Sequence, residues 1–228
     1  GKQNAWRKSD PHLNKVAIWT YFRGAKRDPG IDEGNTTVAY VPDKGWFWYI
    51  PLPDDVVGVG VVAERDYLFD ESHDLPAIFC REVGRNAWIT EHLAPGQQFG
   101  EYFITKEFSY RCQHCAEDGL VLVGDAFAFL DPVFSSGVYL ALRSGELAGD
   151  IVHHALEQGS VAADAFTAYG ERMCFEIEAM RRLVYAFYDQ GFSFGRLIKD
   201  YPDLRGDLTD CLIGNLNKDF TALFSAVA

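Results

Sequence analysis

The sequence predicts a mixed α/β fold of the α+β type, in which a β meander comes first and a helical region follows. Between residues 16 and 63, short runs of β-branched and aromatic residues alternate with turns rich in Gly, Pro and Asp. Beyond residue 138, apolar residues recur at spacings of three and four over long stretches. With 228 residues, 48% of them hydrophobic, the chain is long enough to bury a sizeable core.

Most of the predicted strands lie in the first half of the chain. Tight turns join the first four, which favours an antiparallel sheet with one packed face and one available face. A helix is expected over residues 74–93, because apolar residues there fall at helical spacing. The predicted strands are residues 16–22, 36–41, 46–52, 56–63, 102–110 and 120–123.

The second half is predicted to be helical. One helix is expected over residues 138–157 and a longer one over 162–190, with Gly191 ending it. An aromatic run lies at the end of this longer helix, and its spacing favours helix packing over the lining of a substrate pocket. The run consists of Tyr185, Phe187, Tyr188, Phe192 and Phe194.

Charge and hydropathy exclude several classes of partner. The formal net charge is −12 and the pI is about 4.9. Such a surface repels phosphate backbones and anionic lipids, so neither nucleic acid nor a membrane is expected as a partner. Because no apolar run has spanning length and no signal segment opens the chain, we expect a soluble, cytoplasmic protein.

The five cysteines form an odd, scattered set that is typical of reduced thiols rather than of a disulfide framework. Cys112 and Cys115 have the spacing of zinc and redox sites. A structural zinc site would need a second pair of ligands at similar spacing, and the sequence has none. We therefore expect two ordinary thiols and no metal.

The segment over residues 119–138 carries the most chemical information. A short apolar strand runs into Gly124-Asp125, and Ser136-Gly137 then opens a helix. The strand has the composition of a buried parallel strand, so its partners are expected in sequence outside this chain. Ligands of open α/β sheets bind beyond the carboxyl ends of the strands, where Asp125 could accept hydrogen bonds from sugar-like hydroxyls. The helix start directs free N–H groups to the same crevice, and Gly137 permits close approach of an anion.

This segment resembles the Gly-Asp flavin motif of the class A flavin monooxygenases. The resemblance implies that Asp125 binds the ribityl chain of FAD and that Gly124 forms the turn before it. It also implies that residues of the following loop and helix start lie near the flavin. These are Pro132, Ser136, Gly137 and Val138.

Two further motifs narrow the resemblance to the flavin-dependent halogenases. Residues 45–51 read G-W-F-W-Y-I-P, which matches the W-x-W-x-I-P signature of that family. Residues 129–137 read F-L-D-P-V-F-S-S-G and match its F-x-x-P-x-x-S-x-G pattern. Both stand in the family's order, and the resemblance covers essentially the whole chain.

The resemblance implies a fold and a division of the chain. The chain would be the C-terminal part of a class A flavin monooxygenase-like FAD fold. Residues 1–110 would form the sheet that faces substrate and flavin, and 111–158 the C-terminal part of the FAD-binding domain. Residues 159–228 would form the helical C-terminal region.

The activity implied is halogenation of an electron-rich aromatic substrate, which can be tethered to a carrier protein. Reduced FAD, oxygen and halide would be consumed, and a separate flavin reductase would supply the reduced FAD. The backbone N–H groups of Ser136 and Gly137 would hold the halide. Trp46, Trp48 and Pro51 would line the active site, where the Trp pair excludes ordinary monooxygenation. Tryptophan halogenases carry a glutamate where this chain has Phe134, so the resemblance is to the phenol, pyrrole and aliphatic halogenases.

Some parts of the family pattern are not in this sequence. The string G-V-G-V-V-A over residues 58–63 imitates a phosphate-binding loop, but it lies within a β run. The glycine-rich loop and the family's catalytic lysine are therefore expected in a part of the protein that precedes Gly1. Two alternatives stay open at this stage: an FAD-dependent monooxygenase or dehydrogenase that never uses halide, and an inactive fragment that cannot hold FAD.

Overall fold

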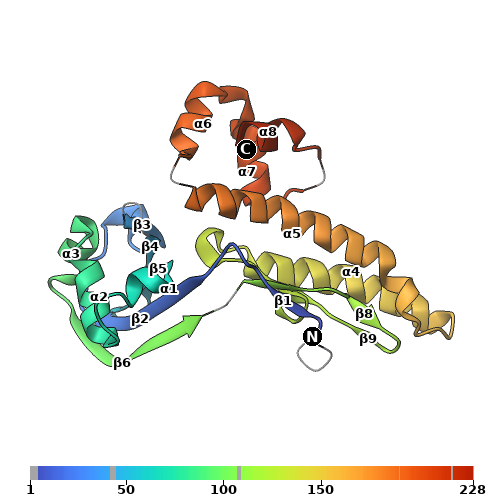
Figure 1. Ribbon diagram of the computed structural model, residues 1–228, viewed down its shortest axis with the longest axis horizontal. Coiled ribbons are helices and arrows are strands. Elements are labelled where there is room, and N and C mark those ends of the chain that lie inside the picture. The colour runs from blue at the N-terminus through green and yellow to red at the C-terminus, as the bar shows by residue number, and fades with distance from the viewer. Residues whose placement is uncertain (1–4, 42–44, 107–108, 190, 217, 228) are drawn as a thin grey trace. The chain divides into compact units, whose positions relative to one another are not determined.

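The computed structural model describes residues 5–41, 45–106, 109–189, 191–216 and 218–227 (Figure 1). The chain forms two compact units. The first, which we call the sheet unit, comprises Pro11–Glu107. The second, the helical unit, comprises Gly1–Asp10 together with Phe108–Ala228.

The sheet unit is built on a five-stranded antiparallel sheet with the order β3-β4-β5-β2-β6. Strands β3, β4 and β5 are joined consecutively, as the sequence predicts, whereas β2 lies between β5 and β6. The strands are β2 (Lys15–Arg23), β3 (Thr37–Val41), β4 (Gly45–Leu52), β5 (Val56–Glu64) and β6 (Gln97–Lys106).

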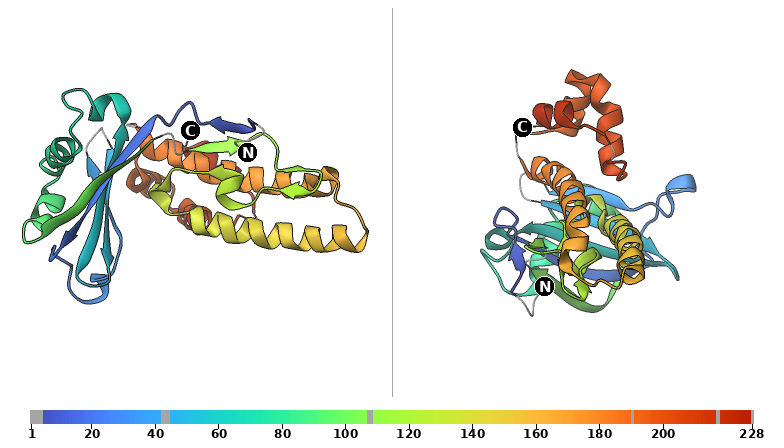
Figure 2. Two further views of the ribbon diagram at one scale, coloured as in Figure 1. Left: turned by 90° about the horizontal axis from the view of Figure 1, so that it is seen from below. Right: turned by 90° about the vertical axis from the view of Figure 1, so that its right-hand side faces the viewer.

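One face of this sheet carries the core of the unit. Alternate residues of a strand point to the same face, and Val57, Val59 and Val61 of β5 are all fully buried. They pack with Ile18 and Phe47 of the neighbouring strands. Three helices cover this face (Figure 1, Figure 2). They are α1 (Arg65–Leu68), α2 (Leu75–Val83) and α3 (Ala87–Leu93), and a short 3-10 turn, η1 (Gly30–Asp32), lies in the loop after β2.

Two predicted elements of the sheet unit need correction. The single helix expected over residues 74–93 is two helices, because Asn86 caps a new one and accepts a hydrogen bond from the Ile89 amide at 2.9 Å. The strand expected over residues 102–110 begins earlier, at Gln97, since Gly96 follows the end of α3. Tyr110 belongs to a different sheet, in the helical unit.

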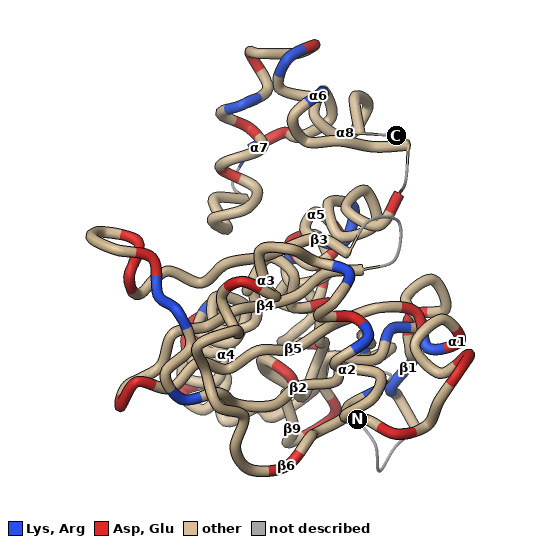
Figure 3. The backbone as a smooth tube through the Cα atoms, turned by 90° about the vertical axis from the view of Figure 1, so that its left-hand side faces the viewer, with Lys and Arg blue, Asp and Glu red and all other residues tan. Residues whose placement is uncertain are grey.

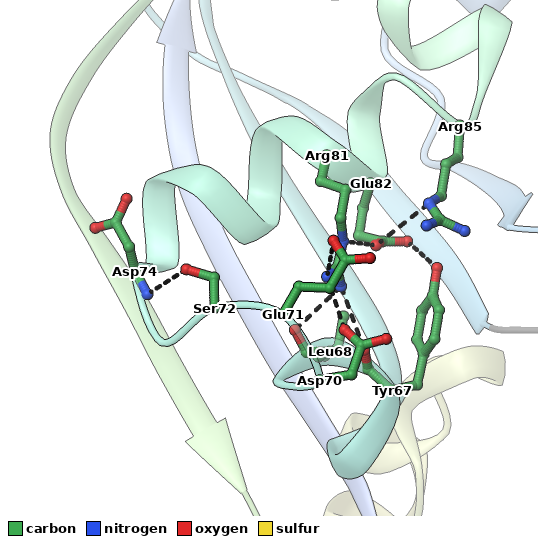
Figure 4. Close-up of polar contacts among 9 residues, drawn as sticks. All are labelled: Tyr67, Leu68, Asp70, Glu71, Ser72, Asp74, Arg81, Glu82 and Arg85. Carbon is green, nitrogen blue, oxygen red and sulfur yellow. Dashed lines mark hydrogen bonds and ion pairs between the residues drawn. The ribbon is translucent and has the colours of Figure 1, made fainter.

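A buried carboxylate joins α1 to α2 (Figure 4). Glu82 is fully buried and accepts a hydrogen bond from the Tyr67 hydroxyl at 2.7 Å. Its other oxygen lies 2.8 Å from Nε of Arg81 and 3.7 Å from Nε of Arg85. Burial and the hydrogen bond to Glu82 raise the pKa of Tyr67 to about 12. The cluster thus places a negative charge in the interior only where two guanidinium groups and a hydroxyl compensate it.

The helical unit is organised around α4 (Gly137–Glu157) and α5 (Thr167–Tyr188), which lie side by side (Figure 1, Figure 2). Gly159, in the left-handed conformation at φ +64°, follows the end of α4. Buried residues of α5 recur at three- and four-residue spacing and face the shared core. The remaining helices are α6 (Phe194–Asp200), α7 (Arg205–Leu212) and α8 (Thr221–Val227).

Short strands and 3-10 turns complete the helical unit. A three-stranded antiparallel sheet has the order β1-β7-β10, and β8 pairs with β9. The strands are β1 (Arg7–Ser9), β7 (Tyr110–Cys112), β8 (Ala116–Glu117), β9 (Leu120–Val121) and β10 (Ala128–Phe129). The turns are η2 (Gly124–Ala126), η3 (Pro132–Phe134), η4 (Ala163–Phe166) and η5 (Pro202–Leu204).

The strand predicted over residues 120–123 differs from the expectation. Within the described residues, β9 is a two-residue strand that pairs antiparallel with β8. The expectation of parallel partners in sequence outside this chain stays a prediction. Leu120 and Val123 are 43% and 38% exposed, whereas Leu122 is buried. The apolar composition predicted a strand here, and within this chain that strand forms a hairpin with β8.

Residues 111–158 and 159–228 share one hydrophobic core, and residues 1–10 join them rather than the sheet. The assignment of 111–158 to an FAD-binding domain stays a prediction. Acidic residues are spread along the backbone of both units (Figure 3). Among the described residues, no helix has the length and apolar character needed to cross a membrane.

Candidate functional site

The two tryptophans of the W-x-W motif lie on the face of the sheet opposite the helices. In β4, Phe47 and Tyr49 point into the helix-covered core. Because successive residues of a strand point to opposite faces, Trp46 and Trp48 lie on the other face. Their rings are 6.0 Å apart. The sequence predicted a common strand face for this pair, and the structure confirms it.

Aromatic residues of two further strands continue this face. Trp48 stands opposite Gly60, Gly60 opposite Trp19, and Trp19 opposite Phe103, so the four form one row across β4, β5, β2 and β6. The Trp19 ring lies 6.2 Å from that of Trp48 and stacks on Phe103 at 5.5 Å. Sequence reasoning missed Trp19 and Phe103, although period-two aromatics in neighbouring strands are a readable signal.

Gly60 is the residue that gives Trp48 its place in the row. A Cβ atom on Gly60 would lie 2.1 Å from the Trp48 ring, so the indole rests directly on the glycine backbone. The glycines of the G-x-G string therefore serve the sheet face and not a phosphate loop. This agrees with the interpretation that the string lies inside a strand, here β5.

Pro51 is not on the same face as the tryptophans. It stands opposite Val57, a core residue, so the alternation of β4 directs it to the helix-covered side. Partner strand β3 pairs with β4 only as far as Tyr49. Beyond that point β4 is an edge, where the missing N–H of a proline costs no ladder hydrogen bond. Pro51 thus fits a structural role at the strand end.

The Gly124-Asp125 turn packs against α4 in the helical unit. Gly124 has φ +51°, and its amide donates to Ser144 Oγ at 2.8 Å. A Cβ atom there would approach Ala141 to 3.2 Å, so both the backbone conformation and the close helix favour glycine. Asp125 follows with an exposed side chain. The turn therefore holds a carboxylate at the surface beside the first turns of α4.

Tyr110 fixes the backbone of this turn from the other side. Its hydroxyl donates to the Asp125 carbonyl oxygen, and the Arg7 guanidinium lies 3.6 Å from the centre of its ring. Burial raises the pKa of Tyr110, with a smaller opposing effect from Arg7. The phenol therefore stays a hydrogen-bond donor at neutral pH.

The loop from Asp131 to Ser136 leads into α4. Pro132 begins the turn η3 and is exposed, whereas the Asp131 side chain is fully buried. Ser135 adopts a left-handed conformation at φ 53°, which is unusual for a residue other than glycine and aims the chain into the helix. Ser136 is nearly buried, at 8% exposure.

The N-terminus of α4 has the features of an anion site. The first N–H groups of a helix lack intrahelical partners, and the Ser136 side chain makes no capping hydrogen bond to them. No acidic residue lies in the first turn. A Cβ atom on Gly137 would meet nothing within 4 Å, and Val138 is 73% exposed. Together with Asp125, these groups offer hydrogen-bond donors for an anionic ring edge and an acceptor for hydroxyls, which fits a flavin.

The structure brings some predicted site residues together within a unit. Gly124, Asp125 and the start of α4 lie in the helical unit, where η2 packs against α4. Trp46, Trp48 and Pro51 lie in the sheet unit. Phe134 packs edge-on against Phe187 and Phe194, with ring centroids 5.9 Å apart in each pair.

Cys112 and Cys115 lie away from any ligand-like cluster. Cys112 is buried and Cys115 half-buried. Burial raises the pKa of both thiols, which lowers their reactivity. Among the described residues, no group of three His, Cys, Asp or Glu side chains could hold a metal ion.

Comparison with known proteins adds a family match. Residues 22–192 match the tryptophan halogenase family model. The chain is 28% identical over 209 residues to a 1H-pyrrole-2-carbonyl-(peptidyl-carrier protein) brominase of Pseudoalteromonas luteoviolacea, covering 88% of this chain and 49% of that protein. It is 25% identical to the corresponding chlorinase of Pseudomonas fluorescens, covering 95% of this chain and 49% of that protein.

Among solved structures, the flavin-dependent brominase Bmp2 superposes with a TM-score of 0.86 at 25% identity. The match covers 96% of this chain and 56% of that one. The chain therefore spans about half the length of the curated relatives it matches.

Proposed function

Because the chain belongs to the tryptophan halogenase family, we propose that the protein is an FADH2-dependent halogenase of an electron-rich aromatic substrate. The observation that carries this proposal is the N-terminus of α4. It is free of side-chain caps and of acidic residues, it is open at Gly137, and it lies beside the Gly124-Asp125 turn.

Each residue of this crevice has a role in the proposal. The Asp125 carboxylate accepts hydrogen bonds from the ribityl hydroxyls of FAD, while Gly124 keeps the turn close to α4. The N–H groups of Ser136 and Gly137 hold the halide, because helix N-termini stabilise anions. Val138 and Pro132 flank the isoalloxazine. When bound, reduced FAD supplies the electrons that let oxygen oxidise the halide.

Within the sheet unit, the proposed substrate surface is the face of the sheet that lies opposite helices α1 to α3. Trp46 is buried, at 2% exposure, and supports this face from within. The half-buried Trp19 and Trp48 and the exposed Phe103 offer the flat apolar surface on which an aromatic ring can stack. Pro51 supports the strand end and does not contact substrate.

The proposed substrate class is a phenol or pyrrole, including one tethered to a carrier protein. Two relatives of this chain are named for pyrrole carried on a peptidyl carrier protein. Phe134 supports the same class of substrate. The resemblance gives tryptophan halogenases a glutamate at this position, and the phenyl ring of Phe134 has no carboxylate with which to bind an indole substrate. A flavin reductase is the proposed source of reduced FAD.

The experiment supplies FAD, a flavin reductase, oxygen and bromide to the protein together with a pyrrolyl carrier-protein thioester or a free phenol. Mass spectrometry of the product gives the outcome, and omission of bromide is the control. We expect a product that carries the bromine isotope pair only when bromide is present. A product that gains oxygen whether or not halide is present would instead assign the protein as a monooxygenase.

A further inference from the structure

Asp131 and Tyr188 connect the loop before α4 to the end of α5. The Asp131 side chain is fully buried. One of its oxygens accepts from the Val133 amide at 3.1 Å, inside the loop, and the other accepts from the Tyr188 hydroxyl at 2.8 Å. A single carboxyl group thereby links the loop backbone to a helix that lies far along the sequence.

The loop needs such a link because its backbone is strained. Ser135 has φ 53°, a conformation that residues with side chains seldom adopt. Its amide donates to the Pro132 carbonyl oxygen at 2.9 Å, which closes a tight turn directly before Ser136 and Gly137. A strained conformation persists only where surrounding contacts hold it, and the buried Asp131 carboxyl group is such a contact.

We propose that Asp131 and Tyr188 are positioning residues for halide, which hold residues 132–136 so that the N–H groups at the start of α4 converge on one anion. This inference rests on the proposed function. Neither residue contacts the halide. Asp131 and Tyr188 keep residues 132–136 in the binding conformation before the halide binds. Hydrogen-bond donors that are already ordered bind an anion more tightly than donors that must become ordered on binding. Phe187, next to Tyr188, packs on Phe134 and supports the loop from the same helix end.

The helix α5 also provides a matched control. Tyr185 lies one turn before Tyr188, and its hydroxyl donates to Asp10 Oδ2 at 2.7 Å. The Asp10 side chain is 2% exposed, so this is also a tyrosine bonded to a buried carboxyl group. Asp10 is outside the loop. Tyr185→Phe therefore removes a comparable hydrogen bond without releasing residues 132–136.

The test compares wild type, Tyr188→Phe and Tyr185→Phe. Chloride is titrated into the FAD-loaded protein and followed by flavin fluorescence, and KM for halide is measured beside kcat. Amide hydrogen exchange of residues 132–138 is measured without flavin. We expect Tyr188→Phe to weaken halide affinity by about tenfold and to speed exchange in the loop, because a lost hydrogen bond to a carboxyl group is of that order. FAD affinity and kcat at saturating halide should change less than halide affinity, since the Gly124-Asp125 turn that is proposed to hold FAD lies outside the released loop.

Three results would overturn the proposal. The positioning role is wrong if wild type responds to chloride and Tyr188→Phe has the same halide affinity as wild type. It is also wrong if Tyr185→Phe weakens halide binding as much as Tyr188→Phe does. In both cases the halide site stands. If wild type holds FAD and shows no response to chloride, the halide site itself is wrong, and the positioning role fails with it.

Discussion

A Cβ atom at Gly60 would lie 2.1 Å from the Trp48 indole, whereas one at Gly58 would meet its nearest neighbour at 3.5 Å. Both glycines belong to β5, and both occupy alternate positions on the same face of the sheet. Their difference therefore isolates the contact with Trp48 from the general effect of glycine in a strand. At the scale of single residues, this pair therefore tests how closely Trp48 packs on β5.

We predict that Gly60→Ala lowers the free energy of unfolding by about 1–3 kcal/mol, because the added methyl group forces the indole out of its position. Gly58→Ala should stay within about 1 kcal/mol of wild type, since its methyl group makes ordinary contacts and alanine is less flexible than glycine. Urea unfolding followed by tryptophan fluorescence measures both. Equal effects of the two variants would show that Trp48 does not rest on Gly60.

Several residue-scale features could be predicted from the sequence. The motif spacing placed Trp46 and Trp48 on one face and Asp125 in a turn before a helix, because period-two alternation and Gly-Asp turns are local properties. Asp131 and Tyr188 could not be paired in this way. Their contact joins positions far apart in the sequence, and a single chain carries no local signal for such a pair.

At the scale of elements, α2 is held to α1 by a charge cluster as well as by apolar packing. Arg81 bonds to Asp70 at 2.9 Å and to the Leu68 carbonyl oxygen at 3.0 Å, in addition to Glu82 (Figure 4). The same helix follows Asp74, which caps it by accepting from the Ala77 amide at 3.1 Å. The position of α2 on the sheet thus depends on the hydrogen bonds and ion pairs of Arg81, and on the cap at Asp74, as well as on apolar packing.

Replacing the fully buried Glu82 with Gln should lower the free energy of unfolding by about 3 kcal/mol, because the half-buried Arg81 and Tyr67 lose a charged partner. Glu71→Gln is the control, because the Glu71 side chain is 69% exposed and its Oε2 lies 3.5 Å from Arg81 Nη1. This ion pair is longer than the 2.8 Å contact between Arg81 and Glu82. The effect of Glu71→Gln should stay within about 0.5 kcal/mol. Chemical denaturation compares the two, and a Glu82→Gln protein as stable as Glu71→Gln would contradict the role of the cluster.

The same scale explains where element prediction was wrong. Hydrophobic periodicity continues across residues 84–86, so the sequence pattern extends one helix where the Asn86 cap begins another. The strand expected over residues 120–123 is shorter, at Leu120–Val121, and its partner within this chain is β8, while parallel partners outside the chain stay a prediction. Composition predicts that a strand forms, whereas strand pairing depends on which partners are within reach.

For the whole molecule, buried tyrosines link stability to alkaline pH. Burial raises the pKa of four tyrosines from 10.0 to about 12, and they lie in both units. They are Tyr49, Tyr67, Tyr169 and Tyr185. Above pH 10 the unfolded chain loses these protons while the folded chain keeps them, so unfolding releases protons and becomes easier as pH rises.

The free energy of unfolding should therefore be nearly constant with respect to these groups below pH 10 and fall between pH 10 and about 12. Replacing Tyr49 and Tyr169 with Phe, each only 2% exposed, should reduce the slope in that range. Tyr201→Phe is the control, because Tyr201 is 52% exposed. Urea unfolding at several alkaline pH values gives the slopes. A double variant with the wild-type slope would contradict this account.

The central claim is that the Gly124-Asp125 turn and the start of α4 form the flavin site, and FAD titration into the protein tests it most directly. Flavin fluorescence is compared for wild type, Asp125→Asn and Asp150→Asn, the last being an exposed aspartate elsewhere on α4. We predict saturable binding that Asp125→Asn weakens about tenfold, because an amide replaces a charged acceptor, and that Asp150→Asn leaves unchanged. Equal affinities of the three proteins, or no saturable binding by wild type, would contradict the claim.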